Sequence, residues 1–270
     1  MKTKVLITVK TYPSLSRKHG ELVCTAGVRE DGSWIRIYPI PFRRLDYANR
    51  FQKYQWIEVD LERNHKKDHR PESHRILGLD SLKVLDRITS TENGGWNRRR
   101  GHVLRNVKKN MTDLIEEAHD REIGTSLATF KPSKIVDVFF RPDAAEWSPA
   151  LLAQFRQRNL FKEWDDPFSV VEKIPWRFYF RLEDIHGRES TMMIEDWETG
   201  QLYRNCLKTS TSKLEAAEKV RQKYLDMAAK TDIHLYLGTT LRHHFASKNP
   251  FIVVGVFSPP PLEPDLFDAV

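Results

Sequence analysis

The sequence contains only two cysteines, Cys24 and Cys206, which lie far apart in a chain of 270 residues. They fit neither a paired zinc-ligand spacing nor the dense pattern of disulfide-stabilised domains. No hydrophobic run is long enough to cross a membrane, and the N-terminal lysines lead into a short VLITV segment that does not resemble a signal peptide. We therefore expect a cytoplasmic protein with free thiols and no membrane contact.

Motifs of common enzymes are also missing. Gly20, Gly27 and Gly32 are too widely spaced for a phosphate-binding loop, and no nucleophile elbow occurs. The three histidines of residues 65–75 lie in a charged segment without apolar periodicity and have no cysteine partners, and the lysines and arginines around them repel cations. We expect no metal, no cofactor and, more generally, a protein without catalytic activity.

Positive charge is concentrated in one half of the chain. Residues 1–110 carry a net charge of +12 and residues 111–270 carry −5, within a total of +7. A basic half joined to a mildly acidic half is typical of polyanion-binding proteins. Nucleic acid, either DNA or RNA, is therefore the expected partner, bound mainly by the N-terminal half. The alternative is a solvated basic surface without a partner.

Residues 22–44 form the most informative stretch, with two β-rich segments around Asp31-Gly32. Asp-Gly favours a hairpin because both residues tolerate positive φ. Strand alternation predicts Ile35 and Ile37 in the core and an outward arginine flanked by two aromatic residues: Trp34, Arg36 and Tyr38. Such a face can stack on bases and pair with phosphate, so alanine at position 36 should weaken binding without lowering stability. The alternative is that the aromatic rings are covered and the arginine meets a carboxylate.

A second strand pattern, in residues 176–182, repeats this arrangement. Trp176, Phe178 and Phe180 are expected to be inward, which leaves Arg177, Tyr179 and Arg181 on the outer face. Basic clusters in predicted loops and turns complete the candidate nucleic-acid-binding set: Arg17, Lys18, Arg43, Arg44, Arg98, Arg99 and Arg100. The last three precede a helix that hydrophobic periodicity predicts over about 102–122.

Short β segments, hairpin turns and intervening helices predict a mainly β protein of the α+β class with two β-rich units. The expected units are a basic N-terminal unit with a helical insertion, a helical connector, a second β-rich unit and an acidic proline-rich tail, over residues 1–145, 146–174, 175–258 and 259–270. In the second unit, the capping box at 212–215 predicts the start of a helix.

Several short motifs resemble the dual OB-fold proteins of bacteria: Ser16–Gly20, Cys24–Gly27, Gly32–Arg36, Asp196–Glu198, Leu202–Arg204 and Gly255–Phe257. The resemblance implies two consecutive OB-like small β-barrels, each able to bind an oligonucleotide or nucleotide, in a protein of prokaryotic conflict and defence systems. Some relatives carry a cysteine and histidine metal knuckle in the second barrel. The corresponding segment here, Leu182–Glu189, has no cysteine, so a zinc site is not expected.

These observations favour a non-catalytic protein that binds or senses nucleic acid or a nucleotide, acting as an accessory recognition subunit. One alternative is a metal-dependent nuclease, whose candidate ligands would be Asp184, His186, Glu195, Asp196 and Glu198. Another is an OB-fold adaptor that binds a protein partner, because a fold does not decide function.

Overall fold

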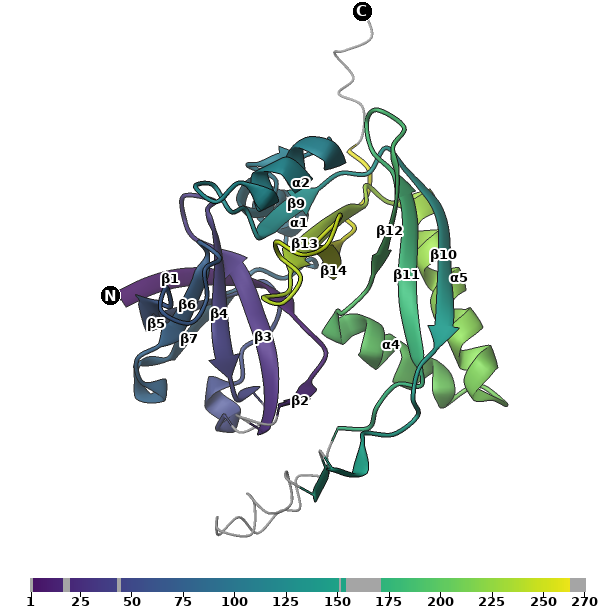
Figure 1. Ribbon diagram of the computed structural model, residues 1–270, viewed down its shortest axis with the longest axis horizontal. Coiled ribbons are helices and arrows are strands. Elements are labelled where there is room, and N and C mark those ends of the chain that lie inside the picture. Colours follow the sequence, from purple (N-terminus) through teal and green to yellow (C-terminus); the bar gives the residue numbers. More distant parts are fainter. Residues whose placement is uncertain (1, 17–19, 43–44, 151, 154–170, 263–270) are drawn as a thin grey trace, which may run out of the picture.

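The computed structural model describes residues 2–16, 20–42, 45–150, 152–153 and 171–262. Its two halves lie side by side (Figure 1), and both mix strands with helices, as the sequence predicts. The elements of the first half are β1 (Lys2–Lys10), β2 (Ser14–Ser16), β3 (Gly20–Val28), β4 (Trp34–Ile40), η2 (Tyr47–Asn49), β5 (Gln55–Arg63), β6 (Ser73–Ile76), η3 (Leu79–Ser81), β7 (Lys83–Arg87) and α1 (Gly95–Val103).

Five strands of the first half close into a β-barrel. The order is β1-β3-β4-β6-β5, and β5 pairs back onto β1, for example at Val5 and Ile57. The β4–β6 pair is parallel, and the other four pairs of the ring are antiparallel. β7 pairs with β5 and β2 with β3, outside the ring. A closed barrel in the N-terminal half is thus confirmed.

The barrel interior follows the predicted alternation. Ile35 and Ile37 of β4 are fully buried, and they pack with Val5, Ile57 and Val59 in one apolar cluster. The turn before β4 differs from the expected primed type, because only Gly32 has a positive φ, of 85°. The Asp31 carboxylate accepts hydrogen bonds from the backbone N–H and the hydroxyl of Ser33, which holds the turn closed.

The second half contains two open sheets. One has the order β10-β11-β12 and the other β14-β13-β9-β8, so these pairings do not by themselves form a second barrel. A single parallel bridge joins Ile194, just after β12, to Val253 of β14. The elements are β8 (Val107–Lys108), α2 (Met111–His119), β9 (Leu127–Phe130), β10 (Lys134–Pro142), β11 (Trp176–Glu183), β12 (Glu189–Met193), α4 (Trp197–Leu207), α5 (Lys213–Lys230), β13 (His234–Thr239) and β14 (Phe251–Phe257). None of the described helices is long and apolar enough to cross a membrane.

Two helical expectations need correction. The single helix expected over about 102–122 is instead α1, the short strand β8 and then α2, which Asn110 caps by accepting from the N–H of Thr112. Helix α4 was not expected, and Asp196 caps it by accepting from the Glu198 N–H. The helix predicted from the 212–215 capping box is confirmed as α5. Much of the expected connector, residues 154–170, and the end of the tail, residues 263–270, lie outside the described residues.

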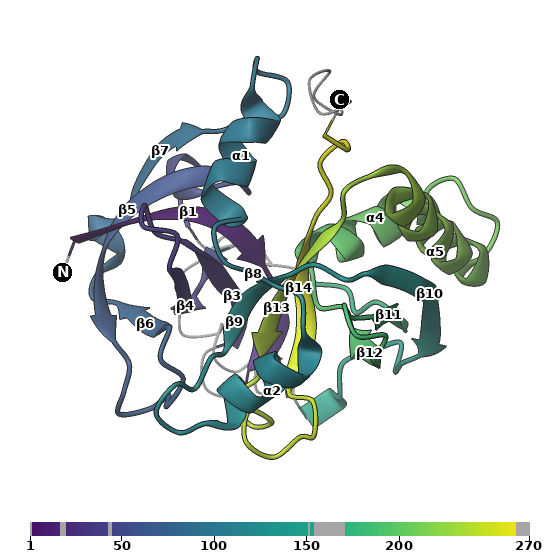
Figure 2. The same ribbon diagram turned by 90° about the horizontal axis from the view of Figure 1, so that it is seen from above.

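A separate apolar cluster joins the two halves. Leu6 and Ala26, on the outer face of the barrel, pack with Tyr236 and Phe257 of the β13–β14 pair. Figure 2 shows these two strands between the barrel and the β10–β12 sheet. The central residues of β1 are consequently buried on both faces. The two halves therefore share a hydrophobic core.

Candidate nucleic-acid interface

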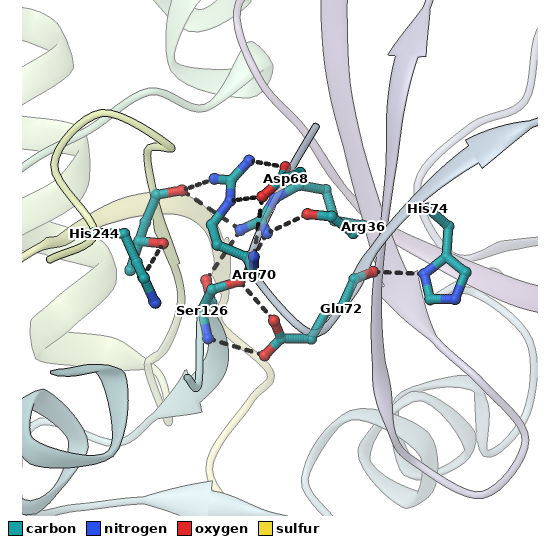
Figure 3. A network of polar contacts seen from close by, with 9 residues as sticks. Arg36, Asp68, Arg70, Glu72, His74, Ser126 and His244 are labelled. Carbon is teal, nitrogen blue, oxygen red and sulfur yellow. Dashed lines mark hydrogen bonds and ion pairs between the residues drawn. The ribbon is translucent and has the colours of Figure 1, made fainter. Parts of the chain in front are cut away.

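Arg36 is buried, although its position on the outer face of β4 was predicted correctly. Its guanidinium donates to the Ser126 hydroxyl at 2.7 Å, to the Ser126 carbonyl at 3.0 Å and, more weakly, to the Thr239 carbonyl. Figure 3 shows Arg36 and Ser126 within this network. Because Ser126 and Thr239 belong to the second half, Arg36 links the two halves. The outer face of β4 is covered by protein. The expectation that Arg36 faces solvent is therefore wrong.

The polar network around Arg36 is balanced in charge. Arg70 is bound at two points by the Asp68 carboxylate, with N–O distances of 2.8 and 2.6 Å. The Glu72 carboxylate accepts from the backbone N–H and the hydroxyl of Ser126. Two guanidinium groups and two carboxylates thus occupy this buried region (Figure 3). These arginines are held by protein groups and therefore offer little to a phosphate.

Trp34 and Tyr38 also turn toward the second half. The Trp34 ring meets the Tyr236 ring edge-on, with 5.4 Å between centroids, so Trp34 contributes to the shared core. Tyr38 is partly exposed and lines a cavity between the halves. Of the three residues predicted for this face, Arg36 and Tyr38 line the cavity and Trp34 does not.

The arginine triplet lies within α1 and not in a turn ahead of a helix. Arg98 pairs with Glu92 at 2.8 Å on the surface. Arg99 is buried over the Tyr54 ring, 4.1 Å from its centroid, and Arg100 approaches Asp232 at 3.7 Å. The three side chains diverge and do not form one cationic surface. The remaining basic candidates, Arg17, Lys18, Arg43 and Arg44, lie outside the described residues.

The second predicted strand face is exposed. Phe178 and Phe180 are buried, and Arg177, Tyr179 and Arg181 lie on the opposite face of β11, as the alternation predicts. The Tyr179 ring stacks on Phe139 of β10 at 5.1 Å with 10° between ring planes. The Arg141 guanidinium lies 5.4 and 5.5 Å from the two ring centroids. We call this surface the aromatic platform; it comprises Phe139, Arg141, Arg177, Tyr179 and Arg181.

Phe139 and Arg141 were not among the sequence candidates. The signal was present, because alternation in β10 places them on the face opposite Val138, which is fully buried. On the other side of the sheet, α5 packs close enough for Arg221 to donate to the Val138 carbonyl at 2.6 Å. The helix covers one face only, so the platform stays accessible.

A cavity of about 910 Å³ lies between the two halves. Tyr12 and Tyr38 line it from the first half, and Trp147 and Trp176 from the second. Arg177 also lines it, so the cavity meets one end of the aromatic platform. The volume lies in the range of small-molecule sites.

Asp196 is the most perturbed acid in the cavity wall. It is 3% exposed, one oxygen caps α4, and its Oδ2 has no hydrogen-bond partner among the described residues. Burial raises the pKa of Asp196 to about 7, although the charges of Lys53 and Lys10 oppose the rise. A buried carboxylate oxygen without a donor is costly in its charged form, which agrees with the raised pKa of Asp196.

Asp196→Asn should stabilise the protein increasingly as pH rises. At pH values between the pKa of an unfolded aspartate and about 7, Asp196 keeps its proton in the folded protein but has lost it in the unfolded chain. The free energy of unfolding therefore falls as the pH rises through this range. Asparagine cannot ionise and still caps the helix. We expect near-equal stabilities at pH 4 and a gain of about 2–4 kcal/mol at pH 8, measured by urea denaturation. A pH-independent difference would contradict this. Glu189→Gln, which removes an exposed acid at the start of β12, should show no gain.

The acids considered for a nuclease do not converge. The Asp184 carboxylate closes a turn, accepting from the N–H groups of Met111, His186 and Arg188. Asp196 caps a helix, and Glu198 pairs with Lys53 at 2.5 Å. Across the described residues, no group of three or more His, Cys, Asp and Glu side chains could hold a metal ion.

Comparison with known proteins gives two family matches. Residues 1–105 match "Domain of unknown function (DUF8758)", and residues 107–270 match "Domain of unknown function (DUF8757)". No curated protein matches the chain. A solved structure of a murine DNA-binding protein with double-stranded DNA aligns over 98% of both chains at 10% identity, with a TM-score of 0.31, which is too low to establish a common fold. Because the second match spans more than half of the sequence, the chain belongs to the family described as "Domain of unknown function (DUF8757)".

Proposed function

We propose that this protein binds single-stranded nucleic acid on the aromatic platform of β10 and β11. The stacked Phe139 and Tyr179 rings, with Arg141 beside both, carry the proposal. Bases stack on exposed aromatic rings irrespective of sequence, while arginines on either side pair with phosphates. Arg177 and Arg181 flank Tyr179 on its strand, and their side chains are about half exposed.

Two ion pairs compete with such binding. Asp143 contacts Arg177 at 3.1 Å, and Asp137 lies 3.9 Å from Arg181. Surface pairs of this kind are worth about 0–1 kcal/mol each, so a phosphate can replace the carboxylate at little cost. The rings of Phe139 and Tyr179 stack on each other across the two strands and stay partly exposed, because the core of the sheet lies on the other face.

A second OB-like barrel in the C-terminal half would account for this surface. β9 and β10 follow each other closely and together pair with β13 and β11, and the Ile194–Val253 bridge relates β12 to β14 in parallel. If β9 and β10 are treated as one bent strand, the ring order is β9/β10-β11-β12-β14-β13. This corresponds to β1-β3-β4-β6-β5 of the first half, and the parallel pair, β12–β14, corresponds to β4–β6. OB folds bind oligonucleotides on such strand faces, which supports the proposal by analogy.

Tyr179→Ala should weaken binding of a single strand by about 5- to 150-fold, since one stacked base contributes about 1–3 kcal/mol. Fluorescence anisotropy with labelled DNA and RNA single strands and a duplex, at 50 and 200 mM salt, would measure it. Wild-type affinity should fall steeply with salt because phosphates are bound. Lys223→Ala, an exposed residue on α5, is the charge control and should change little. Equal binding by the Tyr179 variant and wild type would contradict the proposal.

Salt dependence also tests the competing functions. Retention of a protein partner without nucleic-acid binding, insensitive to salt, would favour the adaptor alternative. Cleavage of the strand with Mg²⁺ or Mn²⁺, lost in Asp196→Ala, would favour the nuclease alternative. Both results would contradict a purely binding function.

A further inference from the structure

The wall of the cavity between the halves contains more cationic than acidic side chains. Burial raises the pKa of Glu195 and of Asp196, both of which line the cavity, and so reduces the negative charge that these acids contribute. The cavity therefore favours an anion over a cation. The lining includes six lysines and arginines and four acids: Arg36, Lys67, Arg70, Arg75, Lys173 and Arg177, with Asp68, Asp143, Glu195 and Asp196.

Three of the arginines in the wall are already engaged. Arg36 and Arg70 are 2% and 6% exposed, and the protein contacts described above hold their guanidinium groups. Arg75 forms a surface ion pair with Glu62. The cations left for a ligand are Lys67, Lys173 and Arg177.

Lys173 and Arg177 share a single carboxylate, that of Asp143. The Lys173 ammonium and the Arg177 Nε each lie 3.1 Å from Asp143 Oδ2. The two side chains are 18% and 52% exposed, so a ligand can reach both. An ammonium carries three N–H donors, and among the described residues Asp143 is the one acceptor that contacts Lys173. This corner of the cavity therefore has accessible donors that no described protein group uses.

Two tryptophan rings line the cavity beside these cations. The Lys173 ammonium lies 5.8 Å from the centroid of the Trp147 ring. The Trp147 indole N–H donates to the Val171 carbonyl at 2.8 Å. That of Trp176 donates to the Lys213 carbonyl at 3.2 Å. These hydrogen bonds hold the rings in place, and an aromatic ring held in this way can pack against another planar ring.

We propose that the cavity binds a nucleotide, with its phosphate on Lys173 and Arg177 and its base against the tryptophan rings. A nucleotide combines an anion with an aromatic ring, which matches the accessible donors and the aromatic wall. An uncharged aromatic molecule would leave the donors unused, and an anion without a ring would leave the rings unused. Lys67, exposed on the wall formed by the first half, adds to the attraction of the anion. The volume of about 910 Å³ accommodates a nucleotide.

The nucleotide can be free or can be the phosphorylated end of a strand. Arg177 belongs to both the cavity and the aromatic platform, and Met193, directly opposite Tyr179 in the β11–β12 pair, also lines the cavity. A strand on the platform can therefore place its terminal nucleotide in the cavity. The strand end as a source rests on the proposed function, whereas a free nucleotide does not.

Lys173→Gln tests the phosphate contact. Isothermal titration calorimetry would compare AMP, GMP, CMP and UMP with the corresponding nucleosides. We expect wild type to bind at least one nucleotide about ten-fold or more tightly than its nucleoside, because the phosphate accepts charge-assisted hydrogen bonds. Lys173→Gln should lower this ratio several-fold, and Lys173→Arg, which keeps the charge, should retain most of it. Lys223→Gln, an exposed lysine of α5 that does not line the cavity, is the matched control and should leave the ratio unchanged.

Trp147→Leu tests the aromatic contact. This variant should weaken binding of the nucleotide and of its nucleoside alike, because both contain the base. Equal binding of every nucleotide and its nucleoside by wild type, no binding of any nucleotide, or an unchanged ratio in Lys173→Gln would each overturn the inference. Inorganic phosphate that binds as tightly as the nucleotides would also overturn it, since the rings would then contribute nothing.

Oligonucleotides with and without a terminal phosphate separate the two sources of the nucleotide. A preference for the phosphorylated strand that Lys173→Gln removes identifies the strand end, and such a preference for mononucleotides alone identifies a free nucleotide. Tyr179→Ala should leave mononucleotide binding intact, because Tyr179 does not line the cavity.

The same titrations separate this inference from the proposed function. If no oligonucleotide binds but mononucleotides bind through Lys173, the platform function fails and the cavity assignment holds. If oligonucleotides bind through Tyr179 and no mononucleotide binds, the platform function holds and the cavity assignment fails.

Discussion

Replacing Arg36 by alanine is expected to lower the free energy of unfolding by about 3–5 kcal/mol, the usual cost of removing one partner from a buried charged network. The Ser126 hydroxyl and carbonyl would lose their charged donor and remain buried. The Asp68 and Glu72 carboxylates would keep only the Arg70 charge within the network. Urea denaturation followed by circular dichroism measures the change.

Two variants make this result specific. Arg36→Lys keeps the charge but loses the planar fork that reaches several oxygens at once, so an intermediate loss is expected. Arg98→Ala removes an arginine from an exposed pair with Glu92 and should cost no more than about 1 kcal/mol. Normal stability of Arg36→Ala with weakened nucleic-acid binding would instead restore the solvent-facing assignment made from sequence.

Phe257→Ala should lower the free energy of unfolding by a similar amount, about 3–5 kcal/mol. The side chain is 1% exposed and contacts the rings of Tyr54 and Trp96 from the first half and Tyr236 from the second. Its loss leaves a cavity within the core that the halves share. Because that core couples them, the variant should still unfold in one transition when followed by two different probes.

Phe180→Ala is the matched variant inside one half. Phe180 is fully buried and packs edge-on against Tyr224 at 5.2 Å, in the core of the second half. A similar cost and the same single transition are expected. Separate transitions in either variant would show that the two halves unfold independently and that the shared core contributes little.

Strand alternation predicted side-chain direction in both key strands but could not predict what covers each face. In β4 it correctly placed Ile37 inside the barrel and Arg36 outside, yet the outside is the contact with Ser126, ninety positions later in the sequence. In β11 the same pattern led to an exposed face, because the rings that cover Phe178 and Phe180, Tyr203 of α4 and Tyr224 of α5, lie on the other side of the sheet. Whether the outer face of a strand is covered or exposed depends on contacts with distant parts of the chain, and local periodicity carries no information about these contacts.

The helix predicted from apolar periodicity was wrong because polar residues between the apolar positions interrupt it. Val103 and Met111 are spaced for one helical face, but Asn110 caps a new helix and Val107 pairs in a sheet with Thr129. Helix α4 was not predicted, although an aspartate followed by an acidic residue in the first turn, here Asp196 and Glu198, is a helix-start signal. The cavity is lined by residues of both halves, so no single sequence motif could predict it.

The contact between the two halves also has a consequence for folding during synthesis. A ribosome releases the barrel strands long before Thr239, whose carbonyl lies 203 positions after Arg36. Until that segment emerges, all five barrel strands are already available to fold. Arg36 and the apolar outer surface of β1 then face water on the nascent chain. We expect the newly synthesised N-terminal half to be a client of chaperones, because exposed apolar surface on incomplete chains promotes aggregation.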